Sequence, residues 1–170
     1  MRLRRARVAD AEAIERIRVR CWQTAYRNVF PPEELDAMVV DASRWRRWLA
    51  EDIEHGQTCF VAEDAKGVLG WVTTGPSGIP ELGELHGLYV DPDSWGHGAG
   101  RALLARGEAE LAATWGDAIL WTLEDNPRTR RFYESAGWRV DGTTGSLAFF
   151  GVEAPVVRYA KRLSSSTSRS

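Results

Sequence analysis

Residues 84–104 read Glu84-Leu-His-Gly-Leu-Tyr-Val-Asp-Pro-Asp-Ser-Trp-Gly-His-Gly-Ala-Gly-Arg-Ala-Leu-Leu104, and this segment carries most of the information in the chain. An apolar strand passes into a helix through a turn with glycine at positions 96, 98 and 100. Glycines let the backbone approach a ligand without interference from Cβ, and the following helix directs free N–H groups and its positive dipole end at the same point. The pattern predicts a nest for a pyrophosphate group.

Two other glycine-rich phosphate sites fit this segment less well. A dinucleotide fingerprint has the spacing G-x-G-x-x-G in an early βαβ unit, whereas the spacing here is G-x-G-x-G. A P-loop requires Gly-Lys followed by Ser or Thr, but Arg101 and Ala102 follow the last glycine here. For this segment alone, a strand-to-helix turn with a purely structural role remains the alternative.

A second motif reads Asn126-Pro-Arg-Thr-Arg-Arg-Phe-Tyr-Glu-Ser-Ala-Gly-Trp138 and follows an apolar strand at residues 118–123. Pro127 in the first turn and Gly137 at the end predict a helix. In this order and spacing, the two motifs resemble those of the GNAT superfamily of acetyl-CoA-dependent N-acetyltransferases. In that family an apolar-x-Val-x-Pro strand end leads into an Arg/Gln-x-x-Gly-x-Gly/Ala turn, and a helix that begins with Asn and contains Phe-Tyr-x-x-x-Gly-Phe follows. The corresponding segments here are residues 88–92, 95–100 and 126–138.

The resemblance covers almost the whole chain, from a first strand near Arg2 to a last strand near Leu163. It implies an α/β fold with a mixed, largely antiparallel central sheet of about seven strands flanked by helices. It also implies acetyl-CoA as co-substrate, bound by the strand residues Leu88, Tyr89 and Val90, the turn residues Trp95, Gly96, His97, Gly98, Ala99, Gly100 and Arg101, and Asn126.

Within that set, the backbone is expected to do most of the binding. Leu88 and Val90 are expected to pair with the pantetheine arm of coenzyme A as with an added strand. Asn126 is expected to cap its helix and to contact the same arm. Trp95 stands where the family most often has Arg or Gln, so its backbone, and not its side chain, is expected to serve the turn.

Acyl transfer to an amine requires removal of a proton, because an alkyl ammonium with a pKa of about 10.4 is almost fully charged at neutral pH. Glu84 and His86 are two residues apart on the predicted strand, which places both side chains on one sheet face, about 7 Å apart. Glu84 falls where some GNAT members carry a catalytic Glu and is the first candidate for the general base. His86 is the second candidate, and a water or a substrate carboxylate is the third.

The leaving thiolate gains from a proton, although a thiol pKa near 8.5 makes that proton helpful and not essential. The Phe-Tyr-x-x-x-Gly match implies that Tyr133 lies beside the sulfur as general acid. Without that match, a tyrosine on a helix is more simply a packing residue.

Composition narrows the class of protein and its compartment. With 170 residues and a net charge of −2, the chain is predicted to form one domain at 1–163 with a disordered polar tail at 164–170. Its mixed charges lack the clustered basic face of nucleic-acid binders.

Cys21 and Cys59 lack metal-ligand spacing and are expected in the core, and the histidines at 55, 86 and 97 form no ligand cluster, so no metal is predicted. Without a signal peptide or a membrane-spanning apolar run, the sequence predicts a cytoplasmic protein.

Periodicity and turn signals predict the remaining elements. The expected strands are residues 3–6, a hairpin of 58–63 and 68–74 with its turn at 64–67, then 82–90, 118–123, 139–150 and 156–161. The expected helices run from a cap at Asp10 to about Tyr26, from Pro31 and Pro32, from a cap at Asp41 or Ser43 through Ile53, over 99–115, and from Asn126.

The acceptor is the least readable part of the predicted site. In GNAT proteins the first two helical segments and the loop between the last two strands shape its pocket. Here that region holds aromatic residues that suit an apolar or aromatic amine or an amino acid, although core packing is the simpler role for each: Trp22, Tyr26, Phe30, Trp45 and Trp48.

The predicted function is acetyl transfer to a primary amine of a small molecule. The alternatives are acetylation of a protein N-terminus or lysine, and coenzyme A binding without catalysis. Family members often pair through their late strands, so a homodimer is also an expectation.

Overall fold

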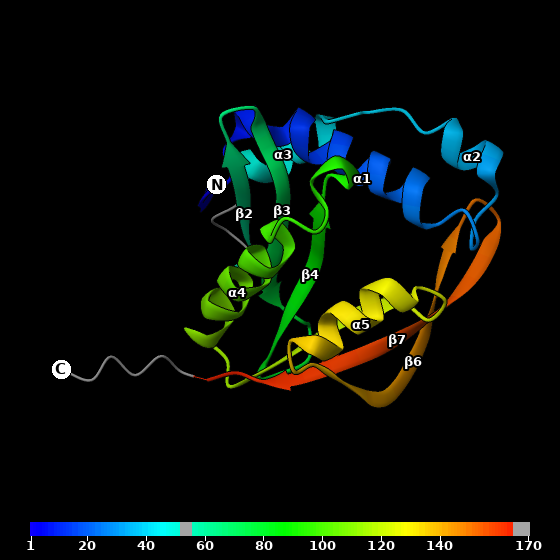
Figure 1. The fold of residues 1–170 in the computed structure, drawn as a ribbon. Coiled ribbons are helices and arrows are strands. Elements are labelled where there is room, and N and C mark those ends of the chain that lie inside the picture. Colours follow the sequence, from blue (N-terminus) through cyan, green and yellow to red (C-terminus); the bar gives the residue numbers. More distant parts are fainter. Residues whose placement is uncertain (52–55, 165–170) are drawn as a thin grey trace.

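The computed structural model describes residues 1–51 and 56–164, which form a seven-stranded sheet with helices on both faces (Figure 1). The strands are β1 (Arg2–Arg5), β2 (Thr58–Asp64), β3 (Gly67–Pro76), β4 (Leu82–Val90), β5 (Asp117–Leu123), β6 (Arg139–Phe149) and β7 (Val152–Arg162). The helices are α1 (Ala11–Ala25), α2 (Pro32–Asp36), α3 (Ser43–Glu51), α4 (Ala99–Ala112) and α5 (Pro127–Ser135), with 3-10 turns η1 (Val8–Asp10) and η2 (Pro92–Ser94). The mixed, largely antiparallel sheet expected from the sequence is confirmed.

The sheet divides in its middle. Its strand order is β1-β2-β3-β4-β5-β7-β6, and β4 with β5 is the parallel pair. These two strands pair over three positions, from Leu82 with Asp117 to Glu84 with Ile119. Beyond Glu84, β4 stays with β3 while β5 stays with β7, and Figure 1 shows β4 running away from β7 and α5. The backbone edge of β4 that β5 leaves is therefore available to another partner.

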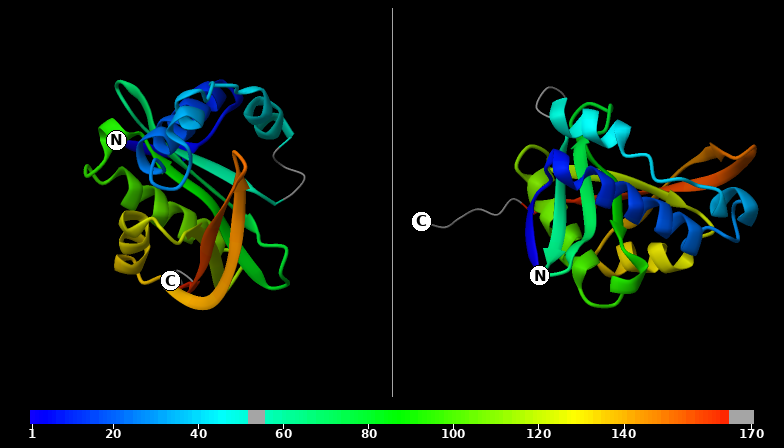
Figure 2. Two further views of the ribbon diagram at one scale, coloured as in Figure 1. Left: turned by 90° about the vertical axis from the view of Figure 1, so that its right-hand side faces the viewer. Right: turned by 90° about the horizontal axis from the view of Figure 1, so that it is seen from above.

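Helices cover both faces of the sheet, α4 and α5 on one and α1 and α3 on the other (Figure 2, left view). Gly107 lets α4 approach the sheet closely, because a Cβ at this position would lie 3.1 Å from Cγ2 of Val72. On the opposite face, Nε1 of Trp71 donates a hydrogen bond to the carbonyl of Ile14 in α1 at 3.0 Å. Both faces of β3 are thus held against a helix.

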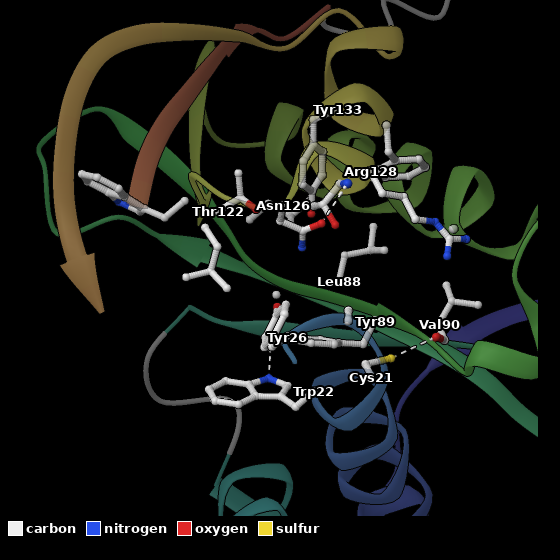
Figure 3. A pocket seen from close by; sticks show the side chains of 18 of the residues that line it. Cys21, Trp22, Tyr26, Leu88, Tyr89, Val90, Thr122, Asn126, Arg128 and Tyr133 are labelled. Carbon is white, nitrogen blue, oxygen red and sulfur yellow. Dashed lines mark hydrogen bonds between the residues drawn. The ribbon is translucent and has the colours of Figure 1, made fainter. Parts of the chain in front are cut away.

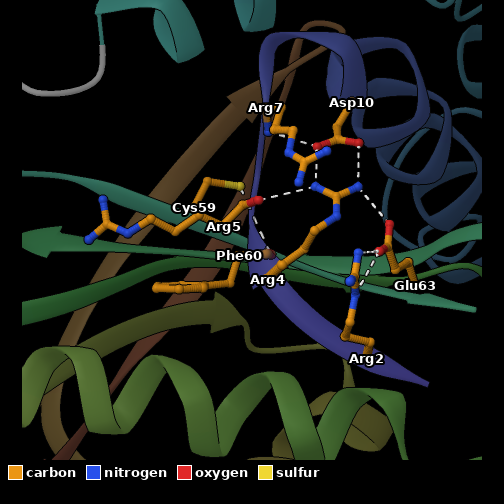
Figure 4. A network of polar contacts seen from close by, with 8 residues as sticks. All are labelled: Arg2, Arg4, Arg5, Arg7, Asp10, Cys59, Phe60 and Glu63. Carbon is orange, nitrogen blue, oxygen red and sulfur yellow. Dashed lines mark hydrogen bonds and ion pairs between the residues drawn. The ribbon is translucent and has the colours of Figure 1, made fainter.

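A polar network joins the N-terminal strand to the start of α1 (Figure 4). The guanidinium of Arg4 donates to Asp10 at 2.7 and 2.9 Å and to Glu63 at 2.6 Å. Asp10 therefore does not cap α1 with its side chain as the sequence predicts; its carboxylate turns back to accept from Arg4 and, at 2.7 Å, from the backbone N–H of Arg7. The hydrogen bonds from Arg4 hold the pKa of Asp10 below its usual range, and those from Arg4 and Arg2 lower the pKa of Glu63 to about 2.

Element boundaries agree with the sequence prediction, with two notable exceptions. The helix α4 ends at Ala112 and not at Trp115, and β7 begins at Val152, four residues before its predicted start. The early start includes Pro155, whose carbonyl accepts from the N–H of Glu124 just past the end of β5. In a strand, the nitrogen and the carbonyl of one residue point to the same side, so the nitrogen of Pro155 also faces the β5 side. Because β5 has already ended there, no hydrogen bond of the sheet is lost through the missing N–H. Ile53, predicted within α3, and the tail at 165–170 lie outside the described residues.

Candidate active site

A cleft of about 970 Å³ opens where β4 and β5 separate, and we call it the central cleft (Figure 3). Both branches of the sheet contribute to it, together with α1, the turn before α4, and α5. The sequence-predicted residues that line it are His86, Leu88, Tyr89, Val90, Trp95, Gly96, Gly98, Gly100, Arg101, Asn126 and Tyr133. Glu84, His97 and Ala99 were also predicted for the site and are not among its lining residues.

Leu88 and Val90 present backbone groups to the central cleft. The N–H of Asp91 donates to the carbonyl of Leu69 at 2.8 Å, so these two residues form a hydrogen-bonded pair of β3 and β4. Bonded and non-bonded pairs alternate in an antiparallel ladder, which makes Val90 and Leu88 members of non-bonded pairs. Their N–H and C=O groups therefore point away from β3, into the gap that β5 leaves.

The Val90 carbonyl already has protein partners. Nε1 of Trp95 donates to it at 2.7 Å and Sγ of Cys21 donates at 3.0 Å (Figure 3 draws the second bond). Burial raises the pKa of Cys21 to about 12, so the thiol keeps its proton at neutral pH and acts as a donor and not as a nucleophile. At this position the N–H of Val90, and not its carbonyl, is the group available for a ligand.

The glycine turn has the backbone conformation that its sequence predicts. Gly96 and Gly98 have φ angles of +82° and +88°, which are strained for residues with a Cβ. Gly98 is the N-cap of α4, and its carbonyl accepts the first helical hydrogen bond, from Ala102 at 3.0 Å. The N–H groups of the first turn of α4 are thus left without helical partners and can receive an anion.

Two residues predicted for the turn keep their side chains out of the central cleft. Ala99 is 1% exposed and belongs to the core cluster beneath the turn. The side chain of His97 is exposed and lies outside the lining of the central cleft. Neither side chain is placed to contact a ligand in the cleft.

Within the segment where β3 and β4 pair, β4 carries one extra residue. Thr73 of β3 pairs with Gly87 and the next residue of β3 pairs with Leu85, which leaves His86 as the extra residue of a β-bulge. The bulge shifts the alternation of side chains by one, so Leu85 and Leu88 both pack on the α4 side of the sheet. The prediction that Glu84 and His86 share a face requires a regular strand, which this segment is not.

The bulge nevertheless brings the two candidate bases together. Nδ1 of His86 lies 3.5 Å from Oε1 of Glu84. Of the two, His86 lines the central cleft. The arrangement is an imidazole at the cleft with a carboxylate behind it.

α5 supplies the groups on the other side of the central cleft. Tyr133 is 5% exposed, and burial, followed by the nearby Tyr89, raises the pKa of its hydroxyl. Within the described part of the chain this hydroxyl has no hydrogen-bond partner, so it is a protonated donor facing the cleft. Oδ1 of Asn126 accepts from the N–H of Thr129 at 3.3 Å, which confirms the predicted helix cap.

The hydroxyl groups of Tyr26, Tyr89 and Tyr133 all belong to residues that line the central cleft. Nε1 of Trp22 donates to the hydroxyl of Tyr89 at 3.2 Å, with Tyr26 beside them (Figure 3). Burial raises the pKa of both Tyr26 and Tyr89, although the sequence gives no reason to expect a side-chain contribution from the second. Tyr26 and Tyr89 therefore add neutral hydroxyl groups to the lining of the central cleft.

Aromatic packing closes one end of the central cleft. Trp22 stacks on Phe30 with ring centroids 5.7 Å apart and meets Phe149 edge-on at 4.8 Å. Phe150 meets Phe30 at 6.0 Å, so the tip of the β6–β7 hairpin is docked on the segment after α1. Trp22 and Tyr26 line the cleft, whereas Phe30 is 2% exposed and supports them from behind.

The other two aromatic residues considered for the acceptor pocket belong to the core. Trp45 lies 4.9 Å from Trp71 and 5.6 Å from Trp48, centroid to centroid, on the α1 face of the sheet. Their indole N–H groups donate to Glu15 at 2.9 Å and to Gln57 at 3.0 Å. Core packing, the simpler role, is the one that the structure gives them.

Several lining residues have no sequence signal of their own. They come from the β5–β7–β6 branch, whose register alone brings them to the cleft: Trp121, Thr122, Leu123, Gly145, Ser146, Leu147 and Val156. A Cβ at Gly145 would lie 3.4 Å from the ring of Trp121, so the glycine makes room for the indole. Arg128 also lines the cleft; it is part of the Asn126 motif, but the motif gives it no role of its own.

The charge lining the central cleft is basic. Its permanently charged groups are the guanidinium groups of Arg101 and Arg128, and no Asp or Glu is among the described residues that line it. In the ranges 1–51 and 56–164, no group of three or more His, Cys, Asp or Glu residues could hold a metal ion. Nor does any helix in those ranges have the length and apolar character needed to cross a membrane.

Known proteins share this fold and sequence pattern. The acetyltransferase (GNAT) family model matches residues 12–138. A Bacillus subtilis protein named as the N-acetyltransferase YuaI is 31% identical over 130 residues, covering 74% of this chain and 73% of its own length. The crystal structure of ribosomal-protein-alanine N-acetyltransferase from Brucella melitensis superposes with a TM-score of 0.78 at 25% identity, covering 96% of this chain and all of that one (100%). The structure of YncA, an acetyltransferase from Salmonella typhimurium with acetyl-CoA, superposes with a TM-score of 0.75 at 21% identity over 99% of this chain and 97% of its own. The chain therefore belongs to the GNAT family of acetyltransferases.

Proposed function

We propose that this protein transfers the acetyl group of acetyl-CoA to a primary amine of a small molecule with an apolar or aromatic body. One observation carries the proposal: a single cleft joins the glycine turn, the imidazole of His86 and the hydroxyl of Tyr133. The split between β4 and β5 supports the donor half, because the edge of β4 offers backbone groups to an extended pantetheine arm.

Proton removal from the amine is assigned to His86, with Glu84 as the residue that orients it. The imidazole lines the central cleft, and the carboxylate lies 3.5 Å from its Nδ1. A general base of this kind contributes about a hundred- to ten-thousand-fold to a rate. Direct action of Glu84, or of a water between Glu84 and the amine, is the alternative.

Tyr133 is assigned to the leaving group. Its raised pKa keeps the hydroxyl protonated, and the hydroxyl faces the central cleft from α5. In the proposed reaction the amine nitrogen bonds to the acetyl carbon and the C–S bond breaks. His86 takes one proton from the ammonium. Tyr133 gives its proton to the thiolate and regains one from the nitrogen, which leaves an amide and a free thiol.

The acceptor class follows from what lines the far end of the central cleft. Trp22, Tyr26 and Trp121 offer ring surface, and among the described residues no carboxylate lines the cleft to hold a charged ammonium group. Such a site favours an amine with an apolar body, and it disfavours polycationic amines. The B. melitensis likeness supports a second candidate, acetylation of a protein N-terminus, whose α-amine has a lower pKa of about 8.

Thiol release from acetyl-CoA, measured with a panel of acceptors, tests the proposal. The panel contains aromatic and aliphatic amines, amino acids, polyamines, and short peptides with free or blocked N-termini. The highest kcat/KM is expected with apolar or aromatic primary amines. A preference for peptides with free N-termini would support the second candidate. Acetyl-CoA binding by calorimetry without turnover on any amine would instead indicate a binding module without catalysis.

A further inference from the structure

Trp95 and Arg128 form a stacked pair at the mouth of the central cleft. The guanidinium carbon of Arg128 lies 3.7 Å from the centroid of the Trp95 ring, a short cation–π distance. The indole is itself fixed, because its Nε1 donates to the Val90 carbonyl at 2.7 Å. A side chain as flexible as arginine is thus held over a rigid platform.

The stacked pair lies beside the glycine turn. Phe132 of α5 packs over Gly100, where a Cβ would be 3.6 Å from its ring. Arg128 is four residues before Phe132 and so shares its face of the helix, one turn nearer to the N-terminus. Trp95 directly precedes the first glycine of the turn. Figure 3 shows Arg128 extending from α5 on the side of the cleft opposite Cys21 and Val90.

Arg128 is a cation without an anion. In the described part of the chain no carboxylate lies within 4.0 Å of its guanidinium, and the same holds for Arg101, the other arginine that lines the central cleft. Arg20 of α1, which lies outside the lining of the cleft, differs because it is paired with Asp91 and Asp93. A fixed guanidinium fork that is exposed and unpaired beside a nest of backbone N–H groups is suited to a phosphate.

We infer that Arg128, oriented by Trp95, binds a phosphate group of coenzyme A. The inference rests on acetyl-CoA as the donor and is independent of the acceptor. It also accounts for the departure at position 95, where the family most often has Arg or Gln. The cation comes from α5 here, and the residue at position 95 supplies the surface on which that cation lies.

Calorimetry with the full chain tests the inference through binding alone. Wild-type protein, Arg128→Gln and Arg131→Gln are titrated with acetyl-CoA and with acetyl-dephospho-CoA, which lacks the 3′-phosphate. Arg131 lies on the same helix and does not line the central cleft, so its variant removes the same charge as a matched control. Arg128→Gln is expected to weaken acetyl-CoA binding by about ten-fold, and Arg131→Gln by less than about two-fold.

The two ligands identify the phosphate. A loss in Arg128→Gln with acetyl-CoA but not with acetyl-dephospho-CoA assigns Arg128 to the 3′-phosphate, and an equal loss with both assigns it to the pyrophosphate. Affinities in Arg128→Gln that match those of Arg131→Gln for both ligands overturn the inference. Failure of the wild-type protein to bind acetyl-CoA would instead remove the proposed function.

A second pair of variants tests the role of the indole. Trp95→Phe keeps a ring beneath Arg128, whereas Trp95→Leu removes it, and both lose the hydrogen bond to Val90. Leu is expected to weaken acetyl-CoA binding several-fold more than Phe does, and to flatten the dependence of affinity on salt. In an Arg128→Gln background, the difference between Phe and Leu is expected to disappear. Persistence of that difference would show that Trp95 acts without Arg128 and would overturn the orienting role.

Discussion

At the scale of single residues, Tyr133 gives the sharpest test of the proposed chemistry. Its hydroxyl has no partner among the described residues, so Tyr133→Phe keeps the buried ring and removes only the proton donor. Turnover is expected to fall by about ten- to a thousand-fold with acetyl-CoA affinity and melting temperature nearly unchanged. The measurement is single-turnover thiol release, which isolates the chemical step. A variant that reacts at the parent rate would make Tyr133 a packing residue.

The roles of Glu84 and His86 are distinguished by how much each substitution lowers kcat/KM. His86→Gln is expected to lower kcat/KM by about a hundred-fold and Glu84→Gln by less, because the carboxylate acts through the imidazole. Both losses are expected to be largest at low pH and to shrink as the free amine becomes abundant. Rates are measured across pH with one amine. A larger loss in Glu84→Gln than in His86→Gln would return the base to Glu84, and a loss that is uniform with pH would indicate positioning only.

At the scale of elements, the turn before α4 depends on backbone conformation more than on space. Gly98 has φ +88° with no heavy atom within 4 Å of the position that a Cβ would take, and the same is true of Gly142 in β6, with φ +86°. Gly98→Val and Gly142→Val therefore impose similar backbone strain, about 1–2 kcal/mol each. Calorimetry is expected to show weaker acetyl-CoA binding for Gly98→Val alone. Equal affinities in the two variants would mean that the turn does not bind phosphate.

At the scale of the whole molecule, the network around Arg4 makes stability depend on pH. The pKa values of Asp10 and Glu63 are lowered in the folded state, so their contribution is present above the unfolded pKa values, near 4, and is lost as pH falls toward 2. Arg4→Met is expected to destabilise the protein by about 2 kcal/mol at pH 7, because Asp10 is buried and loses its partner.

Urea unfolding at several pH values measures this effect. The difference in free energy of unfolding between wild-type protein and Arg4→Met is expected to shrink between about pH 5 and pH 2. Arg162→Met, which breaks an exposed pair with Asp117, is the control and is expected to change stability by less than about 0.5 kcal/mol. A constant difference at all pH values would show that Arg4 acts through packing.

Local signals in the sequence were enough to predict the order and type of the elements. Pro127 begins α5 through its ring and Asn126 caps it through its side-chain oxygen, and both act on their own helix with no need of distant partners. The β-bulge at His86 had no such signal, since it is defined by the register with β3. The stacking of Arg128 on Trp95 likewise joins two motifs that the sequence keeps separate. What sequence analysis missed is what depends on pairing between distant segments.

The extra residue in β4 has a consequence for reading related sequences. Positions 83, 85, 88 and 90 face α4, so the interval between them is two, then three, then two. A saturation substitution scan of this strand is expected to show that these four positions do not tolerate polar residues. The interval of three, which spans His86, should appear in the scan as two tolerant positions in a row. Deleting His86 would restore the regular alternation of side chains along the strand, and either Leu85 or Leu88 would then point away from the core. A relative that lacks the inserted residue is therefore expected to keep an interval of two throughout this strand, and an alignment without a gap at His86 would misassign its core-facing positions.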